Sequence, residues 1–291
     1  MKSVLVTGSN GQLGSELQQL APLHPAFNFT FVTRAELDLS STDAIRAWFA
    51  EKHFDVIINC AAYTAVDKAE TESDLAFAIN ATAVETLATI AKSQQCSLIH
   101  ISTDYVFAGQ NFKPYQETDP TDPQGVYGAS KLAGEQALLS INPAQSVIIR
   151  TAWVYSTVGN NFVKTMLRLG KERDEVGVIY DQVGSPTSAG DLALAIISIV
   201  KHPKLQSLTG TEIYHYSNEG VCSWYDFAKA IFNFSGLDCF VKPIETKDYP
   251  TPAKRPHYSL LNKAKLKHDF AITIPYWQDS LKACLNLLNG K

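Results

Sequence analysis

Two tyrosine–lysine pairs in this chain have the spacing that lets both side chains share one face of a helix. Tyr127 precedes Lys131 in VYGASKLAGE, and Tyr225 precedes Lys229 in SWYDFAKAIF. An ammonium group next to a phenol favours the phenolate and lowers the pKa of the phenol. Such a phenol can donate a proton to a carbonyl oxygen while a hydride attacks the carbon. The spacing permits this chemistry in both pairs, so the surrounding sequence has to decide between them.

The surroundings of the first pair favour chemistry. The strand-like run SLIHIS (97–102) comes before it and continues into STDYVF, which contains Thr103. Ligands of open parallel sheets bind outside the carboxyl ends of the strands. The hydroxyl of Thr103 could therefore hydrogen-bond a substrate carbonyl oxygen and stabilise the developing alkoxide. Lys131 would in addition hold the hydroxyls of a nicotinamide ribose.

The second pair lacks such a setting. Ser223 and Asp226 have the spacing of a capping box, and the apolar residues around them are typical of a helix packed on a core. We therefore expect Tyr225 and Lys229 to lie on an exposed helix face.

A glycine-rich turn, GSNGQLG, follows the first strand-like run and precedes a helical pattern. Glycines allow a tight turn and a close approach of the backbone to a pyrophosphate, and the helix N-terminus favours the anion. This position in the chain predicts a dinucleotide-binding turn, whereas the alternative is a purely structural turn. The predicted cofactor-binding residues are Gly8, Asn10, Gly11, Gln12, Leu13 and Gly14.

The second strand-like run ends in VTRAE, where an acidic residue would be expected to bind an unphosphorylated ribose. Arg34 occupies this place, and a guanidinium matches a 2′-phosphate. The sequence therefore favours NADPH, with NADH as an additional cofactor, unless Arg34 only caps a surface turn. Asp38 and Leu39 follow at a place where they could meet the adenine.

Apolar strand-like runs alternate with helical patterns in the first half of the chain. This alternation predicts an α/β fold with a doubly wound, Rossmann-like parallel sheet. We expect a dinucleotide-binding domain over residues 1–155 and a smaller sugar-nucleotide-binding lobe over 156–291, packed on the first. The predicted strands are 3–8, 29–33, 54–60, 97–102 and 146–151, and the predicted helices are 11–21, 41–52, 73–94, 125–140, 161–172, 188–201 and 224–234.

Composition limits the classes of partner. The 291 residues are 45% hydrophobic and 19% charged, and the net charge of −4 argues against a nucleic-acid partner. No apolar run reaches the roughly 20 residues of a membrane span, and the N-terminal run has no signal-peptide pattern. The five cysteines are widely spaced and include no CxxC, which is typical of reduced thiols. We therefore expect a soluble cytoplasmic protein without a membrane partner.

The combination of motifs resembles a known family. GSNGQLG, CAAYTAVDKAE, INATAV, STDYVFAG, YGASKLAGE and RTAWVYS are similar to motifs of the extended short-chain dehydrogenase/reductase superfamily. Within this superfamily the chain resembles the dTDP-4-dehydrorhamnose reductases, and the resemblance extends over NNFVKTMLRL, DQVGSPTSAGDLA and YPTPAKRPHYSLLN. It implies NADPH-dependent reduction of the 4-keto group of dTDP-4-dehydro-L-rhamnose to dTDP-L-rhamnose.

The resemblance also implies residue roles. Tyr127 would be the proton donor, with Lys131 as its helper and Thr103 as the hydroxyl that tunes it. Ala61, Ala62, Tyr63 and Thr64 would lie along the cofactor. Thr103, Asp104, Trp153, Asn161 and Arg255 would contact the sugar nucleotide. As alternatives, Trp153 could belong to the core, Asn161 could cap a helix, and Arg255 could form a surface ion pair.

Other functions remain open at this stage. The chain could reduce or epimerise a different nucleotide-4-keto-6-deoxysugar, or it could be a non-catalytic NADP-binding regulatory subunit, such as one that assists methionine adenosyltransferase. Dehydratases of this fold carry an acid after the Thr–Asp pair, where this chain has Tyr105. The resemblance also implies that some members of the family form homodimers with a divalent ion such as Mg²⁺ at the interface. Glu16 and Asp191 are the tentative counterparts, and we expect no catalytic metal.

Overall fold

Six parallel strands form the central sheet of the computed structural model, which describes residues 1–290. The strand order is β10-β5-β4-β3-β1-β2, and every neighbouring pair is parallel. The chain first runs outward from β1 to β2 and then returns to β3 on the other side of β1, which creates a switch point between β1 and β3. This topology confirms the predicted doubly wound α/β fold. The strands are β1 Lys2–Thr7, β2 Phe27–Val32, β3 Val56–Asn59, β4 Ser97–Thr103, β5 Ser146–Thr151 and β10 Thr211–His215.

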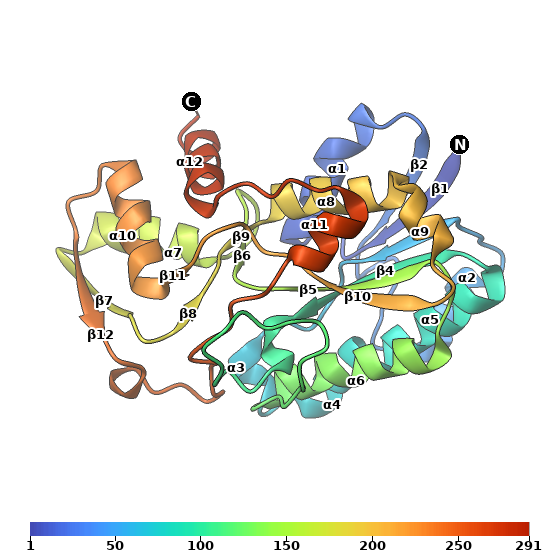
Figure 1. Cartoon of the computed structure of the whole chain (residues 1–291), viewed down its shortest axis with the longest axis horizontal. Coiled ribbons are helices and arrows are strands. Elements are labelled where there is room, and N and C mark those ends of the chain that lie inside the picture. Colours follow the sequence, from blue (N-terminus) through green and yellow to red (C-terminus); the bar gives the residue numbers. More distant parts are fainter. Residues whose placement is uncertain (291) are drawn as a thin grey trace.

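Helices cover both faces of this sheet, which is why its strands are almost continuously apolar (Figure 1). All four residues of β3 and all six of β5 are buried. One face packs on α1 (Gln12–Leu20), α8 (Ala189–Lys201), α9 (Pro203–Ser207) and α11 (Ala264–Phe270). The other face packs on α2 (Thr42–Phe49), α5 (Ala83–Gln94) and α6 (Val126–Ile141).

The helix predicted over 73–94 is present but contains one wide turn. It consists of α4 (Ser73–Phe77), a π-helical turn at Ala78–Thr82 and α5. Asn80 in the π turn binds the backbone N–H of Tyr63 and also donates to the Ser130 hydroxyl of α6. By length and composition the stretch Ser73–Gln94 could cross a membrane, but half of the tested window is buried inside the protein. It is a core helix, and its π turn fixes the loop after β3.

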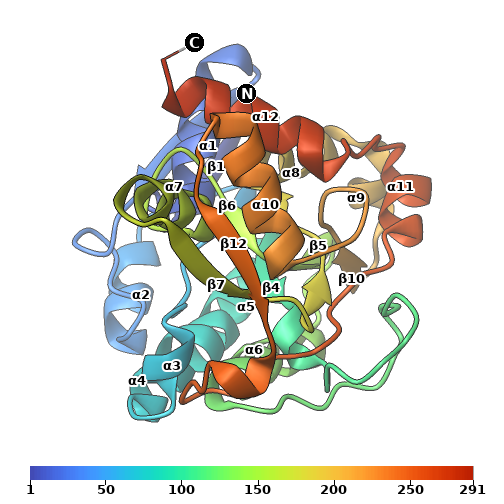
Figure 2. The same ribbon diagram turned by 90° about the vertical axis from the view of Figure 1, so that its left-hand side faces the viewer.

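A second group of elements packs beside the carboxyl ends of the large sheet (Figures 1 and 2). Its separate apolar core contains residues of three helices and of a parallel strand pair, β7 with β12. These elements are α7 Phe162–Glu172, α10 Trp224–Ser235, α12 Trp277–Leu288, β7 Glu175–Ile179 and β12 Phe240–Ile244. Two short pairs connect this group to the sheet: β6 Val154–Tyr155 with β9 Thr187–Ser188, and β8 Val183–Gly184 with β11 Cys222–Ser223.

The predicted strands and helices are found with shifts of a few residues at their ends. The elements that were not predicted are β7, β10, β12, the helices α11 and α12, and several short ones, among them α3 (Val66–Ala69) and the 3₁₀ turns Ala21–Leu23, Asp104–Val106 and Thr246–Asp248. β10, α8, α9 and α11 follow residue 155 in the chain but pack on the large sheet. The substrate-binding role of the second half stays a prediction.

Candidate active site

A cavity of about 840 Å³ opens at the carboxyl ends of the central strands. Thr7, Thr103 and Thr151 line it, and each is the last residue of its strand, β1, β4 and β5 respectively. The cavity reaches the switch point between β1 and β3, where ligands of open α/β sheets bind. The fold therefore brings polar strand ends together that are far apart in the sequence.

The glycine turn forms one wall of this cavity. Neighbouring backbone atoms approach it so closely that side chains at Gly8 and Gly14 would not fit. Gly8 has a φ of +66°, and a Cβ on it would lie 2.7 Å from the Ala61 nitrogen. A Cβ on Gly14 would lie 2.4 Å from the Gly8 carbonyl oxygen, so Gly14 lets α1 pack against the turn. In the described chain, no side chain caps the N-terminus of α1 at Gly11. Its free N–H groups and the missing Cβ atoms form a cradle that fits an anionic pyrophosphate.

Most of the predicted site residues line this single cavity. Gly14, Asn161 and Arg255 lie outside its lining. The predicted residues that line it are Gly8, Asn10, Gly11, Gln12, Leu13, Arg34, Asp38, Leu39, Ala61, Ala62, Tyr63, Thr64, Thr103, Asp104, Tyr127, Lys131 and Trp153.

Tyr127 lies in the first turn of α6 and is partly exposed to the cavity. Gly128 behind it lets the helix approach closely, since a Cβ there would lie 2.3 Å from the Tyr105 carbonyl oxygen. Desolvation raises the pKa of Tyr127 to about 12, while the Thr103 hydroxyl opposes this shift and the nearby Asp104 carboxylate adds to it. The pKa is thus raised, not lowered as expected from the neighbouring Lys131, and Tyr127 is a neutral phenol that can donate a proton at neutral pH.

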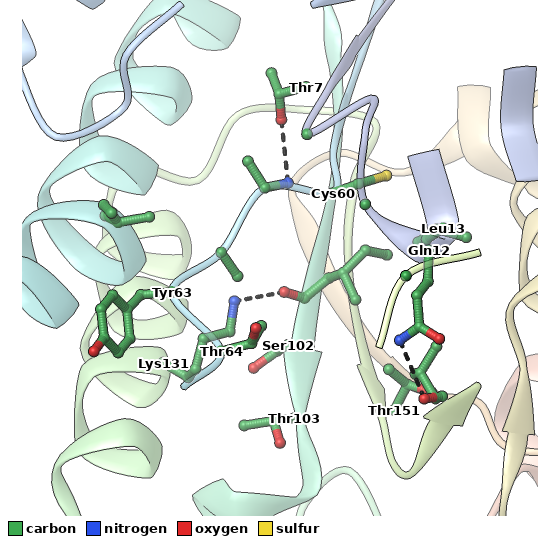
Figure 3. Close-up of a pocket in the computed structure, with 18 of the residues that line it drawn as sticks. Thr7, Gln12, Leu13, Cys60, Tyr63, Thr64, Ser102, Thr103, Lys131 and Thr151 are labelled. Atoms are coloured by element: carbon green, nitrogen blue, oxygen red, sulfur yellow. Dashed lines mark hydrogen bonds between the residues drawn. The ribbon is translucent and has the colours of Figure 1, made fainter. Parts of the chain in front are cut away.

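Lys131 follows one turn later on α6 and is buried, with 1% of its surface exposed. Its Nζ donates to the Ile101 carbonyl oxygen of β4 at 2.6 Å and lies 3.3 Å from His100 Nε2. Burial lowers its pKa to about 8, although Glu135 opposes this shift. Figure 3 shows Lys131, Ser102 and Thr103 together at the cavity wall. The amine is thus held by the strand that also carries Thr103.

Thr103 and Asp104 form a small polar group at the end of β4. The Thr103 hydroxyl donates to Asp104 Oδ1 at 3.0 Å and accepts from the Tyr105 backbone N–H at 3.2 Å. Burial raises the pKa of Asp104 to about 6, although the nearby Ser259 and Thr103 hydroxyls oppose this shift. Within residues 1–290, Asp104 Oδ2 and Ser102 Oγ are buried without a hydrogen-bond partner. Buried polar atoms of this kind are normally satisfied, so both are suited to bind a polar ligand.

Arg34 lies at the cavity rim after β2, with 71% of its side chain exposed. Its Nε is 3.7 Å from Asp38 Oδ1, and Asp38 is in turn held by the backbone and hydroxyl of Ser40. This contact involves only Nε, so the other N–H groups of the guanidinium are available to an anion. Asp38 itself has a pKa below its ordinary value, chiefly because of the Ser40 hydrogen bonds.

The three candidates from the second half of the chain have different surroundings. Trp153 lines the cavity with a left-handed φ of +51° and stacks on Trp224, with ring centroids 3.7 Å apart. Asn161 caps α7 and donates to Gln12 Oε1 at 2.9 Å. Arg255 forms a bidentate ion pair with Asp67 of α3. Their direct contact with a ligand stays a prediction.

The second tyrosine–lysine pair lies on α10, outside the cavity. The predicted capping box between Ser223 and Asp226 is present. Lys229 is exposed, and Tyr225 is half-buried against the apolar core of α7, α10 and α12 rather than fully exposed.

The cavity residues that were not predicted as site residues include Thr7, Cys60, Ser102, Tyr105, Thr151 and Gly159. Thr7 and Thr151 could have been found from one signal, because each is a polar residue that ends an apolar strand. Gly159 lies in the loop after β6, and nothing in its local sequence indicates that it reaches the glycine turn.

Glu16 and Asp191, the tentative counterparts of interface metal ligands, are not part of a metal-binding cluster among the described residues. Over residues 1–290 there is no group of three or more His, Cys, Asp or Glu side chains placed to hold a metal ion. Asp191 accepts hydrogen bonds from Asn218 and Ser280. Glu16 lies close to Gly190, which precedes Asp191 at the start of α8.

Comparison with known proteins identifies the family. The family model for the RmlD substrate binding domain matches residues 1–289. A dTDP-4-dehydrorhamnose reductase of Aggregatibacter actinomycetemcomitans is 42% identical over 288 residues, which cover 97% of this chain and 98% of the relative. The chain belongs to the dTDP-4-dehydrorhamnose reductase family.

Solved structures of this family have the same fold. A dTDP-4-dehydrorhamnose reductase from Clostridium acetobutylicum matches with a TM-score of 0.92 and 43% identity, over 99% of both chains. The enzyme from Bacillus anthracis in complex with NADP matches with a TM-score of 0.90 and 40% identity, over 98% of both chains. The family and fold inferred from the sequence are thus confirmed, and a family member binds the predicted cofactor.

Proposed function

We propose that this protein uses NADPH to reduce the 4-keto group of dTDP-4-dehydro-L-rhamnose, giving dTDP-L-rhamnose. The observation that carries the proposal is the grouping of Tyr127, Lys131 and Thr103 in one cavity with the glycine turn. Membership of the dTDP-4-dehydrorhamnose reductase family supports the substrate, and the NADP complex of a relative supports the cofactor.

The cavity fits NADPH in both charge and shape. The turn Gly8–Gly14 with the free N-terminus of α1 would hold the pyrophosphate, and Arg34 would bind the 2′-phosphate. Asp38 and Leu39 would flank the adenine, and residues 61–64 would lie along the dinucleotide. NADPH, when bound, supplies the hydride; NADH, which lacks the phosphate that Arg34 matches, would bind more weakly.

The protein's part in the reaction is to place the carbonyl and to supply a proton. The Thr103 hydroxyl and the Tyr127 phenol would both hydrogen-bond the 4-keto oxygen. As the hydride reaches C4, the Tyr127 Oη proton moves to this oxygen, which becomes the hydroxyl of the product. The Lys131 ammonium stabilises the phenolate that remains and would also bind the nicotinamide ribose. The phenolate then regains a proton before the next turnover.

The rest of the sugar nucleotide would meet polar and aromatic groups around the same cavity. The unpartnered Asp104 Oδ2 can accept a hydrogen bond from a sugar hydroxyl, and Trp153 can pack on the sugar. Asn161 and Arg255 are proposed to act at the nucleotide end. We further propose that the protein works in the cytoplasm, where its five free cysteines would stay reduced, and that it forms a homodimer.

Matched tyrosine variants test this proposal. Purified protein should oxidise NADPH when dTDP-4-dehydro-L-rhamnose is supplied and should not do so without it, as followed by absorbance. Tyr127→Phe should lower kcat by at least a hundredfold with little change in NADPH affinity, because only the proton donor is removed. Tyr225→Phe, with the same spacing to a lysine but outside the cavity, should stay within about twofold of the parent protein. A silent parent protein, or an equal loss in both variants, would contradict the proposal.

A further inference from the structure

A buried histidine lies directly behind the catalytic lysine. His100 is in the middle of β4 and has no exposed surface. Its Nε2 lies 3.3 Å from Lys131 Nζ, and its Nδ1 lies 3.1 Å from Asn59 Nδ2. His100 does not line the cavity, so it can act only through Lys131.

The contact with Asn59 extends this polar chain to the first strand. Asn59 ends β3 and is 1% exposed, and its Oδ1 lies 2.6 Å from the hydroxyl of Thr7, the last residue of β1. The polar chain Thr7–Asn59–His100–Lys131 therefore crosses three adjacent strands beneath the cofactor wall. Figure 3 shows its two ends, Thr7 and Lys131, among the residues that line the cavity.

We infer that His100 is a positioning residue for Lys131 and that its tautomer follows the charge of the lysine amine. The effect on turnover rests on the reductase activity proposed above, whereas the hydrogen-bond order can be measured without any substrate.

Two arrangements of the protons give every group in this polar chain of side chains a hydrogen-bond partner. In the first order, Thr7 donates to Asn59 Oδ1 and Asn59 Nδ2 donates to His100 Nδ1. His100 then carries its proton on Nε2 and donates to the lone pair of a neutral amine. In the second order the amide of Asn59 is turned by 180°, which exchanges its oxygen and nitrogen without changing its shape. His100 then donates from Nδ1 to Asn59, and Nε2 accepts from the ammonium of Lys131.

The imidazole remains neutral in both orders. Burial, with the nearby Lys131 as a second cause, lowers the pKa of His100 well below its ordinary value. A neutral imidazole has one N–H and one lone pair, so it can complement either state of the amine but not both at once. The hydroxyl of Thr7 can likewise donate or accept. Lys131 can therefore change its charge without leaving a buried polar group unpaired, which would be costly.

Few other charged groups act on Lys131. Glu135, one turn further along α6, is held by Arg150 of β5 through Oε2 at 2.6 Å. Tyr127 precedes Lys131 on the same helix, and Asp104 after β4 acts on Tyr127. The Ile101 carbonyl is the other acceptor of the amine. Among the groups that contact Lys131 Nζ, His100 is thus the one that can change from hydrogen-bond acceptor to hydrogen-bond donor.

Histidine NMR tests the coupling directly. Protein labelled with ¹⁵N at histidine should show the Nδ1–H tautomer of His100 at pH 6 and the Nε2–H tautomer at pH 10, with the change near pH 8 where Lys131 loses its proton. The signal is assigned by its absence in His100→Gln. In Lys131→Met the tautomer should not change with pH. A tautomer that is the same at pH 6 and pH 10 in the parent protein would overturn the inference, whether or not the protein is a reductase.

Two amide variants then test the effect on turnover. His100→Gln keeps a polar group near the Nε2 position, towards Lys131, whereas His100→Asn keeps one near the Nδ1 position, towards Asn59. In His100→Asn the ammonium loses an acceptor, so the pKa of Lys131 falls further. The pH above which kcat declines should therefore be about one unit lower than in the parent protein. His100→Gln should keep the pH profile of the parent protein.

The pH profile separates positioning from a purely structural role. A structural role would lower kcat in both variants by a pH-independent factor, and this result would overturn the inference. If the parent protein does not oxidise NADPH with the nucleotide sugar, the proposed function fails, and the NMR measurement alone decides on the tautomer.

Discussion

Tyr127 and Tyr225 have the same four-residue spacing to a lysine, but their neighbours differ. Desolvation and Asp104 raise the pKa of Tyr127 to about 12, whereas the Thr103 hydroxyl lowers it. Tyr225 instead packs against the apolar core of α7, α10 and α12. Local sequence could select the first pair because Thr103 and Tyr127 flank one strand end. It could not predict the contact of Lys131 with His100, since 31 residues separate the two.

We expect the buried Asp104 carboxylate to lower the stability of the protein while it serves substrate binding. Its pKa is about 6 in the folded protein and about 3.9 in an unfolded chain. The folded state therefore binds the proton more tightly, and this group lowers the stability as pH rises from about 4 to about 6. Asp104→Asn removes this penalty. We expect its free energy of unfolding at pH 7 to exceed that of the parent protein by about 1–3 kcal/mol, as measured by urea denaturation.

The pH dependence provides the control for Asp104→Asn. At pH 4 both side chains are neutral, so the difference in unfolding free energy should nearly vanish. The KM for the nucleotide sugar should rise about tenfold at neutral pH, because an uncharged amide is a weaker acceptor for a sugar hydroxyl. A variant that is less stable than the parent protein at pH 7 would show that the carboxylate is stabilised by contacts and not penalised by burial.

At the scale of elements, the glycine turn joins β1 to α1 at the switch point of the sheet. We expect Gly8→Ala to disrupt this turn for two reasons. The residue has a left-handed φ of +66°, and its Cβ would lie 2.7 Å from the Ala61 nitrogen. The turn would have to move away from β3, and the pyrophosphate cradle would change shape. We expect the Kd for NADPH to rise at least tenfold in a fluorescence titration.

Gly236 offers a matched control for this substitution. It ends α10 with a φ of +65°, and within residues 1–290 nothing lies within 4 Å of a Cβ built on it. Gly236→Ala should therefore cost about 1 kcal/mol of stability and leave the Kd for NADPH unchanged. If both variants bind NADPH equally well, the close approach of Gly8 to β3 does not matter for the cofactor.

The elements that the sequence predicts are those whose signal is local. β1, β3, β4 and β5 are mainly apolar runs, and helical stretches follow them later in the chain. β10 is a short run of five residues that pairs with β5, 65 positions earlier, and β12 begins with an exposed Phe240 and contains Pro243. Such strands are stabilised by distant partners and by burial, which a local pattern does not contain.

For the molecule as a whole, the glycine turn contacts the second group of elements through one side chain. Gln12 Nε2 donates to the Val154 carbonyl at 3.3 Å, and Asn161 Nδ2 donates to Gln12 Oε1 at 2.9 Å, across 149 residues of sequence. Gly159 and Asn160 of the intervening loop line the cavity. The side chain of Gln12, predicted as a cofactor contact, thus holds a loop that also lines the cavity.

Asn161→Asp is expected to break this link while keeping the helix α7 intact. An aspartate at this position still caps the helix by accepting from the Lys164 N–H, but it no longer donates to Gln12. The loop 156–161 should then lose its fixed position, and the Kd for NADPH should rise about fivefold, with a midpoint of thermal unfolding within about 2 °C of the parent protein. Asn161→Ala loses both the cap and the link, so it should weaken NADPH binding similarly and also cost about 1 kcal/mol of stability. Unchanged NADPH binding in Asn161→Asp would mean that the loop keeps its position through its other contacts, such as the hydrogen bond from the Val158 N–H to the Ser156 hydroxyl.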